Sequence, residues 1–276
     1  MIDALNGVTT YTYDAIGQVT EVTNARGCTS TIEYDADHRI VTESNPLAEE
    51  GSDTHRVKYC YDEMGRVLEK TNENGTSVSY TYDANGNILT ETDERGNVTT
   101  YTYNGNNQVT SVTDPLGNET HYTYTPTMML ETETDALNGV TTYTYDANDN
   151  VASITDPMNF VTSYTYDEEE RVKTITDARN NTYSYTYDAN GNLTRIDNPD
   201  GGVEVYEYDL NDQLVKFTDA ENYITTYAYD ANGNLIKITD PRDNEQVTEY
   251  DALNRPTKLI NEEGGEVTIE YDAVGN

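Results

Sequence analysis

The 276-residue sequence has no tryptophan, only 2 phenylalanines and 2 cysteines, and few aliphatic residues to build a hydrophobic core. Leu, Ile, Val and Phe make up about 17% of the chain, below the ~20% under which a highly charged chain is usually disordered. Cys28 and Cys60 are too few for a disulfide scaffold and are not spaced like metal ligands. Composition alone therefore predicts a disordered chain with two unpaired thiols.

Basic residues are also scarce, because 16 Lys and Arg stand against 51 Asp and Glu, for a formal net charge of −35. This charge repels phosphate backbones and anionic lipids, so we do not expect nucleic acid as a partner. No run approaches the ~18 apolar residues of a membrane-spanning helix, so no membrane insertion is expected. The first five residues also lack the basic and apolar regions of a signal peptide.

The sequence does contain a strict repeat that is centred on tyrosine. Tyrosines followed by Asp, or once each by Asn and Thr, define thirteen registers at a spacing of 21 residues. One interval is 27 residues long, and residues 46–52 within it indicate a loop insertion. Because periodicity is a stronger signal than composition, we predict a folded chain. The register tyrosines are Tyr13, Tyr34, Tyr61, Tyr82, Tyr103, Tyr124, Tyr145, Tyr166, Tyr187, Tyr208, Tyr229, Tyr250 and Tyr271.

Each register predicts a β-hairpin. In Ser79-Tyr80-Thr81-Tyr82 the tyrosines alternate with small hydroxylated residues, which is typical of a strand. Four residues after the register tyrosine stands Gly, Asn, Asp or His, which tolerate positive φ, with Met128 and Glu170 as exceptions. The Asp after the tyrosine can accept hydrogen bonds from the following backbone. The residues to which we assign this structural role include Tyr13, Asp14, Tyr82, Asp83, Gly86, Tyr145, Asp146, Tyr187, Asp188, Gly191, Tyr229, Asp230 and Gly233.

Two further positions complete the repeat. Six residues after the register tyrosine stands an aliphatic residue, except at Pro256, and it can face the tyrosines across the hairpin. Eleven residues after the tyrosine stands Asp or Asn, where the chain turns again. One repeat therefore consists of two strands and two turns.

The predicted fold class is all-β, with tandem 21-residue β-hairpin repeats that form one long antiparallel sheet. Thirteen registers give roughly 26 strands, or a strip about 125 Å long at ~4.8 Å per strand. Open sheets rarely exceed ~10 strands without curling, so we expect a curved or spiral, hollow, shell-like wall without a packed core. Strand ladders and tyrosine stacking between neighbouring repeats should stabilise it.

We expect residues 1–276 to form a single repeat array that is a piece of a longer one. Asp3 occupies the second-turn place of an earlier repeat, and Asn276 follows directly after a first turn. Strand edges left unpaired at such ends recruit further strands, so we also expect end-to-end self-association.

The segments Tyr-Asp-Ala-Asn-Gly-Asn-Leu at 187–193 and 229–235, and Tyr-Asp-Glu-Met-Gly-Arg-Val at 61–67, resemble the YD repeat of the rearrangement-hotspot (RHS) family. The resemblance covers essentially the whole chain. That family includes bacterial polymorphic toxins, wall-associated proteins, shell subunits of ABC toxin complexes and teneurins. The resemblance implies a hairpin strip that spirals into a shell, which in the toxins encloses a C-terminal effector. It also implies an extracellular or cell-surface location, with adjoining repeats or a toxin effector domain as partners.

No constellation of catalytic residues interrupts the repeat. His38, His55 and His121 lie in different registers without a paired nucleophile, so we predict no enzyme activity and no cofactor. The turn at 83–87 has oxygen ligands at alternate positions, as a calcium loop begins, but it lacks the later bidentate acid, so we assign no metal site. The motif Asp-Pro-Leu-Gly at 114–117 is similar to part of the family's self-cleaving segment, yet it occupies an ordinary second-turn place, and we interpret it as a turn.

We therefore predict a non-enzymatic segment of the encapsulating shell of a secreted or surface RHS-type toxin-delivery protein. The alternative is a cell-surface adhesion module whose tyrosines stack on carbohydrate or bind a partner protein. For that function the irregular segments 46–52, 125–130 and 167–170 are the candidate contact loops.

Overall fold

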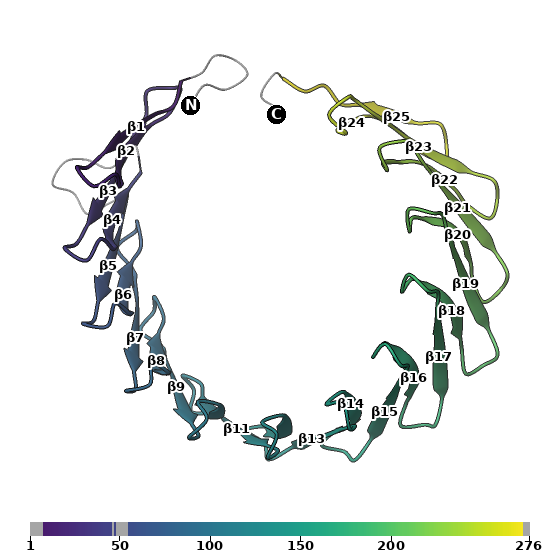
Figure 1. Cartoon of the computed structure of the whole chain (residues 1–276), viewed down its shortest axis with the longest axis horizontal. Helices are drawn as coiled ribbons and strands as arrows, with labels where there is room; N and C mark the ends of the chain where they lie inside the picture. Colours follow the sequence, from purple (N-terminus) through teal and green to yellow (C-terminus); the bar gives the residue numbers. More distant parts are fainter. Residues whose placement is uncertain (1–7, 46, 48–54, 273–276) are drawn as a thin grey trace. The chain divides into compact units, whose positions relative to one another are not determined.

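The computed structural model describes residues 8–45, 47 and 55–272, which form 25 β-strands and no helix (Figure 1). Accordingly, no described helix is long and apolar enough to cross a membrane. Strands that lead to a register tyrosine, here the long strands, have six residues except for the first and the last described strand. They alternate with five-residue short strands that begin six residues after the register tyrosine. The all-β class and the tandem hairpins that the sequence predicts are confirmed.

The long strands carry odd numbers: β1 (Thr10–Tyr13), β3 (Thr29–Tyr34), β5 (Arg56–Tyr61), β7 (Ser77–Tyr82), β9 (Val98–Tyr103), β11 (Glu119–Tyr124), β13 (Val140–Tyr145), β15 (Val161–Tyr166), β17 (Thr182–Tyr187), β19 (Val203–Tyr208), β21 (Ile224–Tyr229), β23 (Glu245–Tyr250) and β25 (Glu266–Thr268). The short strands carry even numbers: β2 (Val19–Thr23), β4 (Ile40–Ser44), β6 (Val67–Thr71), β8 (Ile88–Thr92), β10 (Val109–Thr113), β12 (Leu130–Thr134), β14 (Val151–Thr155), β16 (Val172–Thr176), β18 (Leu193–Asp197), β20 (Leu214–Thr218), β22 (Leu235–Thr239) and β24 (Pro256–Ile260).

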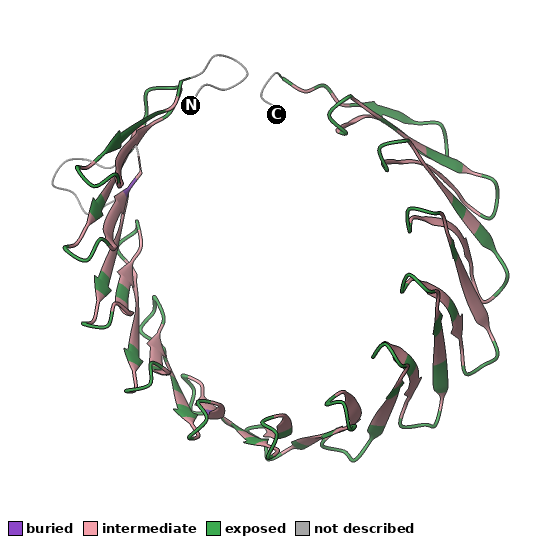
Figure 2. Ribbon diagram, in the orientation of Figure 1, coloured by how far each residue is buried: buried purple, intermediate pink, exposed green. Residues whose placement is uncertain are grey.

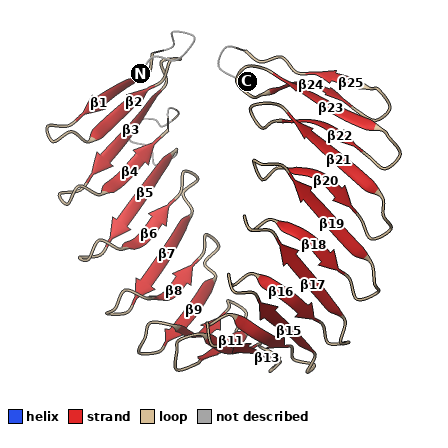
Figure 3. Ribbon diagram, turned by 45° about the vertical axis from the view of Figure 1, so that its right-hand side comes forward, coloured by secondary structure: helices blue, strands red, loops and turns tan. Residues whose placement is uncertain are grey.

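The chain divides between Gly139 and Val140 into two compact units, one with β1–β12 and the other with β13–β25. Within each unit, consecutive strands pair antiparallel, and hairpin follows hairpin without a crossover (Figure 3). The strands of each unit follow an arc, which confirms the predicted curvature (Figure 1).

A β-bulge beside each register tyrosine contributes to this curvature. In the hairpin β7–β8, Thr81 pairs with Thr90 and Tyr82 pairs with Ile88, so the register shifts by one residue between them. The other long-to-short hairpins shift at the equivalent place. Because a bulge bends its strand and increases the local twist, the same irregularity in every repeat turns a flat ribbon into an arc.

Strand alternation gives the sheet two different faces. We call the face that carries the register tyrosines and the aliphatic residues opposite them the tyrosine face. The other face, here the threonine face, carries paired hydroxyls such as Thr81 and Thr90, whose oxygens lie 2.6 Å apart. Thr165 and Thr174 repeat this contact at the same distance.

The sheet is a single layer without a packed core. Among the described residues no hydrophobic side chain is buried, and only Ser44 and Ser111 fall below a tenth of their full exposure. Most strand residues are half-buried, whereas the turns are exposed (Figure 2). The absence of a core that the low aliphatic content predicts is confirmed for the described residues, so each repeat is stabilised mainly by its two neighbours.

One expectation about this stabilisation is wrong. Close aromatic rings occur within a hairpin, as for Tyr59 and Tyr61 at 6.3 Å and for Tyr206 and Phe217 at 5.0 Å. The ring pairs found among the described residues lie within one strand or one hairpin. Equivalent tyrosines are two strands apart, or about 9.6 Å, which exceeds the ~7 Å limit of aromatic contacts.

Candidate functional site

The turn after each long strand is built around the side chain that follows the register tyrosine. In the turn 83–87, which we call a first turn, Asp83 N–H donates to the carbonyl of Asn87 (2.9 Å), and Gly86 N–H donates to the carbonyl of Asp83 (3.2 Å). One carboxylate oxygen of Asp83 accepts from the N–H groups of Asn85 (2.9 Å) and Asn87 (2.8 Å). The other accepts from the Asn87 amide (2.8 Å). The carboxylate thus satisfies backbone donors within its own turn.

The second turns, such as 93–97, repeat this geometry. Asp93 accepts from the N–H groups of Arg95 and Asn97, both at 2.8 Å, and Gly96 adopts φ +81°. The segment Asp114–Gly117 is an ordinary second turn, with Gly117 N–H donating to the Asp114 carbonyl at 3.0 Å.

The fourth residue of each first turn, here the left-handed position, has positive φ whatever its side chain. Gly86 adopts +92°, whereas the two exceptions to the residue pattern, Met128 and Glu170, adopt +69° and +62°. Backbone geometry is therefore retained even where an unfavourable residue type carries it. His38 occupies the same position at φ +67°.

The register tyrosines join neighbouring repeats through their hydroxyl groups. Each hydroxyl in this series donates to the main-chain carbonyl at the start of the preceding short strand, with O···O distances from 2.7 to 3.1 Å. The pairs, donor first, are Tyr34–Val19, Tyr61–Ile40, Tyr82–Val67, Tyr103–Ile88, Tyr124–Val109, Tyr166–Val151, Tyr187–Val172, Tyr208–Leu193, Tyr229–Leu214, Tyr250–Leu235 and Tyr271–Pro256. We call this series the tyrosine ladder.

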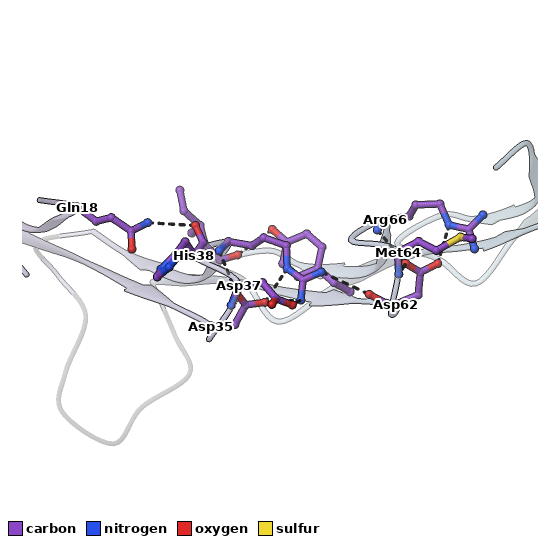
Figure 4. Close-up of polar contacts among 10 residues, drawn as sticks. Gln18, Asp35, Asp37, His38, Asp62, Met64 and Arg66 are labelled. Carbon is purple, nitrogen blue, oxygen red and sulfur yellow. Dashed lines mark hydrogen bonds and ion pairs between the residues drawn. The ribbon is translucent and has the colours of Figure 1, made fainter. Parts of the chain in front are cut away.

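A second set of contacts between repeats comes from the fifth residue of the first turn, here the bridging position. The Gln18 amide donates to the carbonyl of His38 at 3.1 Å (Figure 4). The equivalent donors, each reaching the next first turn, are Arg39, Arg66, Asn87, Gln108, Arg171, Asn192, Gln213 and Asn234. Sequence reasoning did not identify this position, although its recurrent Gln, Arg and Asn were a usable signal.

The thirteen residues assigned from the sequence lie at the ends of long strands and in the first turns that follow them. The five tyrosines end long strands, the five aspartates that follow them begin first turns, and Gly86, Gly191 and Gly233 occupy left-handed positions at φ +92°, +95° and +87°. The carboxylates among them that accept from two backbone N–H groups each are Asp14, Asp83, Asp146, Asp188 and Asp230. The tyrosines among them are Tyr13, Tyr82, Tyr145, Tyr187 and Tyr229, and Tyr13 is 56% exposed.

The electrostatics of the turns follow from these contacts. Hydrogen bonds from the Asn87 side chain and from backbone N–H groups hold the pKa of Asp83 below its usual value, although partial desolvation opposes them. Burial raises the pKa of the Tyr103 hydroxyl, and the nearby Asp83 charge adds to this. Folding therefore favours the ionised form of Asp83 and the neutral form of Tyr103.

The residues considered for catalysis and metal binding lie apart from one another in the fold. His38 is in the turn after β3, His55 lies just before β5, and His121 is in β11 with its Nε2 3.5 Å from Glu119. No group of three or more His, Cys, Asp or Glu within the described ranges is arranged to hold a metal. In the turn 83–87, whose sequence is similar to the start of a calcium loop, the Asp83 carboxylate oxygens already accept three hydrogen bonds.

Two of the three irregular segments form ordinary first turns. In 125–129 the Thr125 hydroxyl replaces the usual carboxylate and accepts from Met129 N–H at 3.1 Å. In 167–171, Asp167 accepts from Glu169 and Arg171 N–H. Of the 46–52 insertion only Leu47 lies within the described residues.

The repeat detected in the sequence corresponds to a known protein family. Ten overlapping matches to the RHS repeat model extend over residues 1–29, 13–50, 61–98, 82–119, 103–133, 129–157, 145–182, 166–203, 208–245 and 229–267. The chain belongs to the RHS repeat family. No match was found among curated proteins.

Two solved structures share the fold. The chain is similar to one in the crystal structure of TcdB2-TccC3-TEV, with a TM-score of 0.66 and 15% identity over 91% of this chain and 18% of that one. It is also similar to a chain of the Photorhabdus luminescens Tc holotoxin pore with a mutation in TccC3, with a TM-score of 0.52 and 16% identity over 95% of this chain and 20% of that one. This RHS array thus spans about a fifth of those chains. Neither match supports the alternative adhesion function.

Proposed function

We propose that this RHS array is a structural, non-enzymatic wall segment of a shell that encloses a toxin or effector polypeptide. The observation that carries the proposal is the tyrosine ladder, which joins hairpin to hairpin through a main-chain carbonyl in a sheet without a core. Such a sheet repeats the same contacts from one hairpin to the next. These repeated contacts hold neighbouring hairpins of the wall together.

Two further observations support this role. The family is that of RHS repeats, and one of the similar structures is a Tc holotoxin pore whose chain is about five times as long as the matched region. A wall of this kind needs a parent protein to close it, so we propose that residues 1–276 act as one continuous array within such a parent. We also propose a secreted or cell-surface location, with adjoining repeats and an effector domain as its partners.

A test of enclosure uses the full natural protein that contains this chain. Thr120 and Thr123 lie in β11 on opposite faces of the sheet, because their positions differ by an odd number. Variants with Thr120→Cys or Thr123→Cys, in a background where Cys28 and Cys60 are replaced by Ser, are treated with a small maleimide and with a polymer-linked maleimide. Enclosure predicts that one face reacts with the small reagent only.

The control is the same pair of variants in the isolated 276-residue chain, where both faces should react with both reagents. Equal reaction of both faces with the polymer-linked reagent in the full protein would refute enclosure. End-to-end association of the isolated chain stays a separate prediction, which light scattering across a salt series tests, because screening weakens the repulsion of its net charge.

A further inference from the structure

We propose that the bridging residue of one repeat specifies which residue occupies the left-handed position of the next repeat. The contacts between successive first turns fall into three classes, and each class fits a different side chain at the left-handed position. The rule would determine which hairpins can be neighbours in the array. It goes beyond the proposed wall function, because it concerns recognition between repeats.

In the first class the bridging residue is arginine and the next left-handed residue is glycine. Arg66 is anchored to Asp62 of its own turn at 2.6 Å, and its Nη1 donates to the carbonyl of Asp83 in the next turn at 3.0 Å. The guanidinium carbon lies 4.5 Å from the centre of the Tyr82 ring. Arg171 makes the same contacts with Asp167, Asp188 and Tyr187.

The guanidinium of this class lies close to where a side chain at the left-handed position would begin. A Cβ placed on Gly65 would lie 3.1 Å from Arg39 Nη1, which is closer than normal packing allows. The corresponding distances are 3.8 Å for Gly86 and 3.9 Å for Gly191, which place a Cβ in van der Waals contact with the guanidinium. Arginine at the bridging position therefore fits glycine at the next left-handed position, and at Gly65 a side chain would have to displace the guanidinium.

In the second class the bridging residue is asparagine and the next left-handed residue is asparagine or aspartate. The amide groups of Asn85 and Asn87 both donate to the side-chain oxygen of Asn107, at 3.0 and 2.8 Å. Asn190 and Asn192 contact Asp212 in the same way, at 2.8 and 2.7 Å. Asn232 and Asn234 converge on Asn254, at 3.1 and 2.9 Å. Glycine offers no side-chain oxygen for this contact.

In the third class the bridging residue is glutamine, and the next left-handed residue varies. Gln18, Gln108 and Gln213 donate to the main-chain carbonyls of His38, Met128 and Gly233. Because a carbonyl is present in every residue, this hydrogen bond places no demand on the side chain, although a Cβ placed on Gly233 would lie 3.3 Å from Gln213 Nε2. This accounts for the methionine at position 128, which the residue pattern does not explain.

One bridging asparagine, Asn150, does not fit the second class, and its contacts agree with the rule. Asn150 is followed by Glu170, whose carboxylate is one methylene farther from the backbone than that of aspartate. Among the described residues Asn150 makes its side-chain contact with Asp146 of its own turn, at 3.5 Å, and none with the next turn. A bridging asparagine without Asn or Asp opposite it thus makes no bridge.

A double-mutant cycle tests the rule by converting a second-class contact into a first-class contact. Asn87→Arg and Asn107→Gly are made singly and together in the full 276-residue chain, and the unfolding equilibrium constant is measured in urea. Asn87→Arg alone should destabilise, because Asn107 occupies the space that the guanidinium needs. Together the two changes should restore a matched pair, with a favourable coupling of at least about threefold in the unfolding constant.

The control cycle combines Asn87→Arg with Asn159→Gly. Asn159 also adopts positive φ, at +65°, but it belongs to a distant second turn, so its relief of backbone strain should not couple to position 87. Equal coupling in both cycles, or none in the first, would overturn the proposal. Should Asn87→Arg prevent folding, rescue of folding by Asn107→Gly supports the rule. The cycle of Asn192→Arg and Asp212→Gly then tests the same prediction at another pair of repeats.

Discussion

The tyrosine ladder gives a sharp prediction, because removing one hydroxyl deletes one contact between two repeats and leaves the ring in place. In Tyr103→Phe the lost hydrogen bond is the one to the Ile88 carbonyl, at 2.7 Å. A typical intramolecular hydrogen bond contributes about 1 kcal/mol net, and a fully buried orphaned partner costs about 1–3 kcal/mol. Tyr103 is half-buried, so water can replace the lost donor, and the lower figure applies.

We therefore expect Tyr103→Phe to destabilise the chain by about 1 kcal/mol, which is about a fivefold change in the unfolding constant at 1.4 kcal/mol per tenfold. The matched control is Tyr164→Phe. Tyr164 lies on the same face two residues before a register tyrosine, and no hydrogen bond of its hydroxyl occurs among the described contacts. This control should stay within about 0.3 kcal/mol of the parent chain, the range of a neutral surface change.

Urea unfolding followed by circular dichroism measures both variants. The Tyr187 hydroxyl donates to the Val172 carbonyl at 2.9 Å. Because a repeat array is stabilised by contacts between nearest neighbours, Tyr187→Phe should lower the free energy of unfolding about as much as Tyr103→Phe. Equal effects of Tyr103→Phe and Tyr164→Phe would refute the ladder as a source of stability. So would a loss confined to one register.

Further predictions concern the turns and the pH dependence. Gly86→Val should lower the free energy of unfolding, measured in urea, by more than ~1 kcal/mol, because valine is strongly disfavoured at φ +92°. The control Gly105→Val should lower it much less, since Gly105 is not at positive φ. Met128→Gly should stabilise by up to about 1 kcal/mol, because it relieves a left-handed residue whose side chain is 57% exposed; a destabilised variant would contradict this. Burial raises the pKa of the ladder residue Tyr103, so its stabilising effect is complete below the unfolded-state pKa of about 10 and is lost as the pH rises through the folded-state value. Tyrosinate absorbance and urea unfolding, measured over the same pH range, should report this loss together. The pKa of Asp83 is lowered, so its contribution to stability is complete above the unfolded-state pKa of about 3.9 and is lost as the pH falls through the folded-state value. In the variant Asp83→Asn the stability measured in urea should therefore fall less between neutral and acidic pH than in the parent chain.

The fold was predictable from the sequence because its main determinants are local. Alternation such as Ser79-Tyr80-Thr81-Tyr82 specifies a strand, and Gly86 four residues after Tyr82 specifies a left-handed turn residue. Both signals act within about ten residues and recur at a fixed period. Long-range topology then adds little, since within each unit every hairpin pairs with the next one along the chain.

The contacts between repeats were less predictable, because they depend on distances across strands. The sequence indicated that the register tyrosines hold the wall together, but stacking was the wrong mechanism, since the two-strand separation is too large for ring contact. The hydroxyl of Tyr103 reaches a main-chain carbonyl instead, and a carbonyl leaves no residue-type signal in the sequence. The role of Arg66 was missed for a related reason, because its partner in the next turn is the backbone of Asp83.

The two sets of contacts between repeats place different demands on the sequence. The tyrosine ladder recognises only a main-chain carbonyl, so the residue at the start of the short strand can be Val, Ile or Leu, and even Pro256, which lacks an N–H but retains its carbonyl for Tyr271 at 2.8 Å. The bridging contacts instead depend on side chains, as the convergence of Asn85 and Asn87 on Asn107 shows. A general contact that joins any two repeats thus coexists with a selective contact that distinguishes them. An array built this way can be extended by duplication without losing its ladder, while the bridging residues restrict which repeats can follow one another.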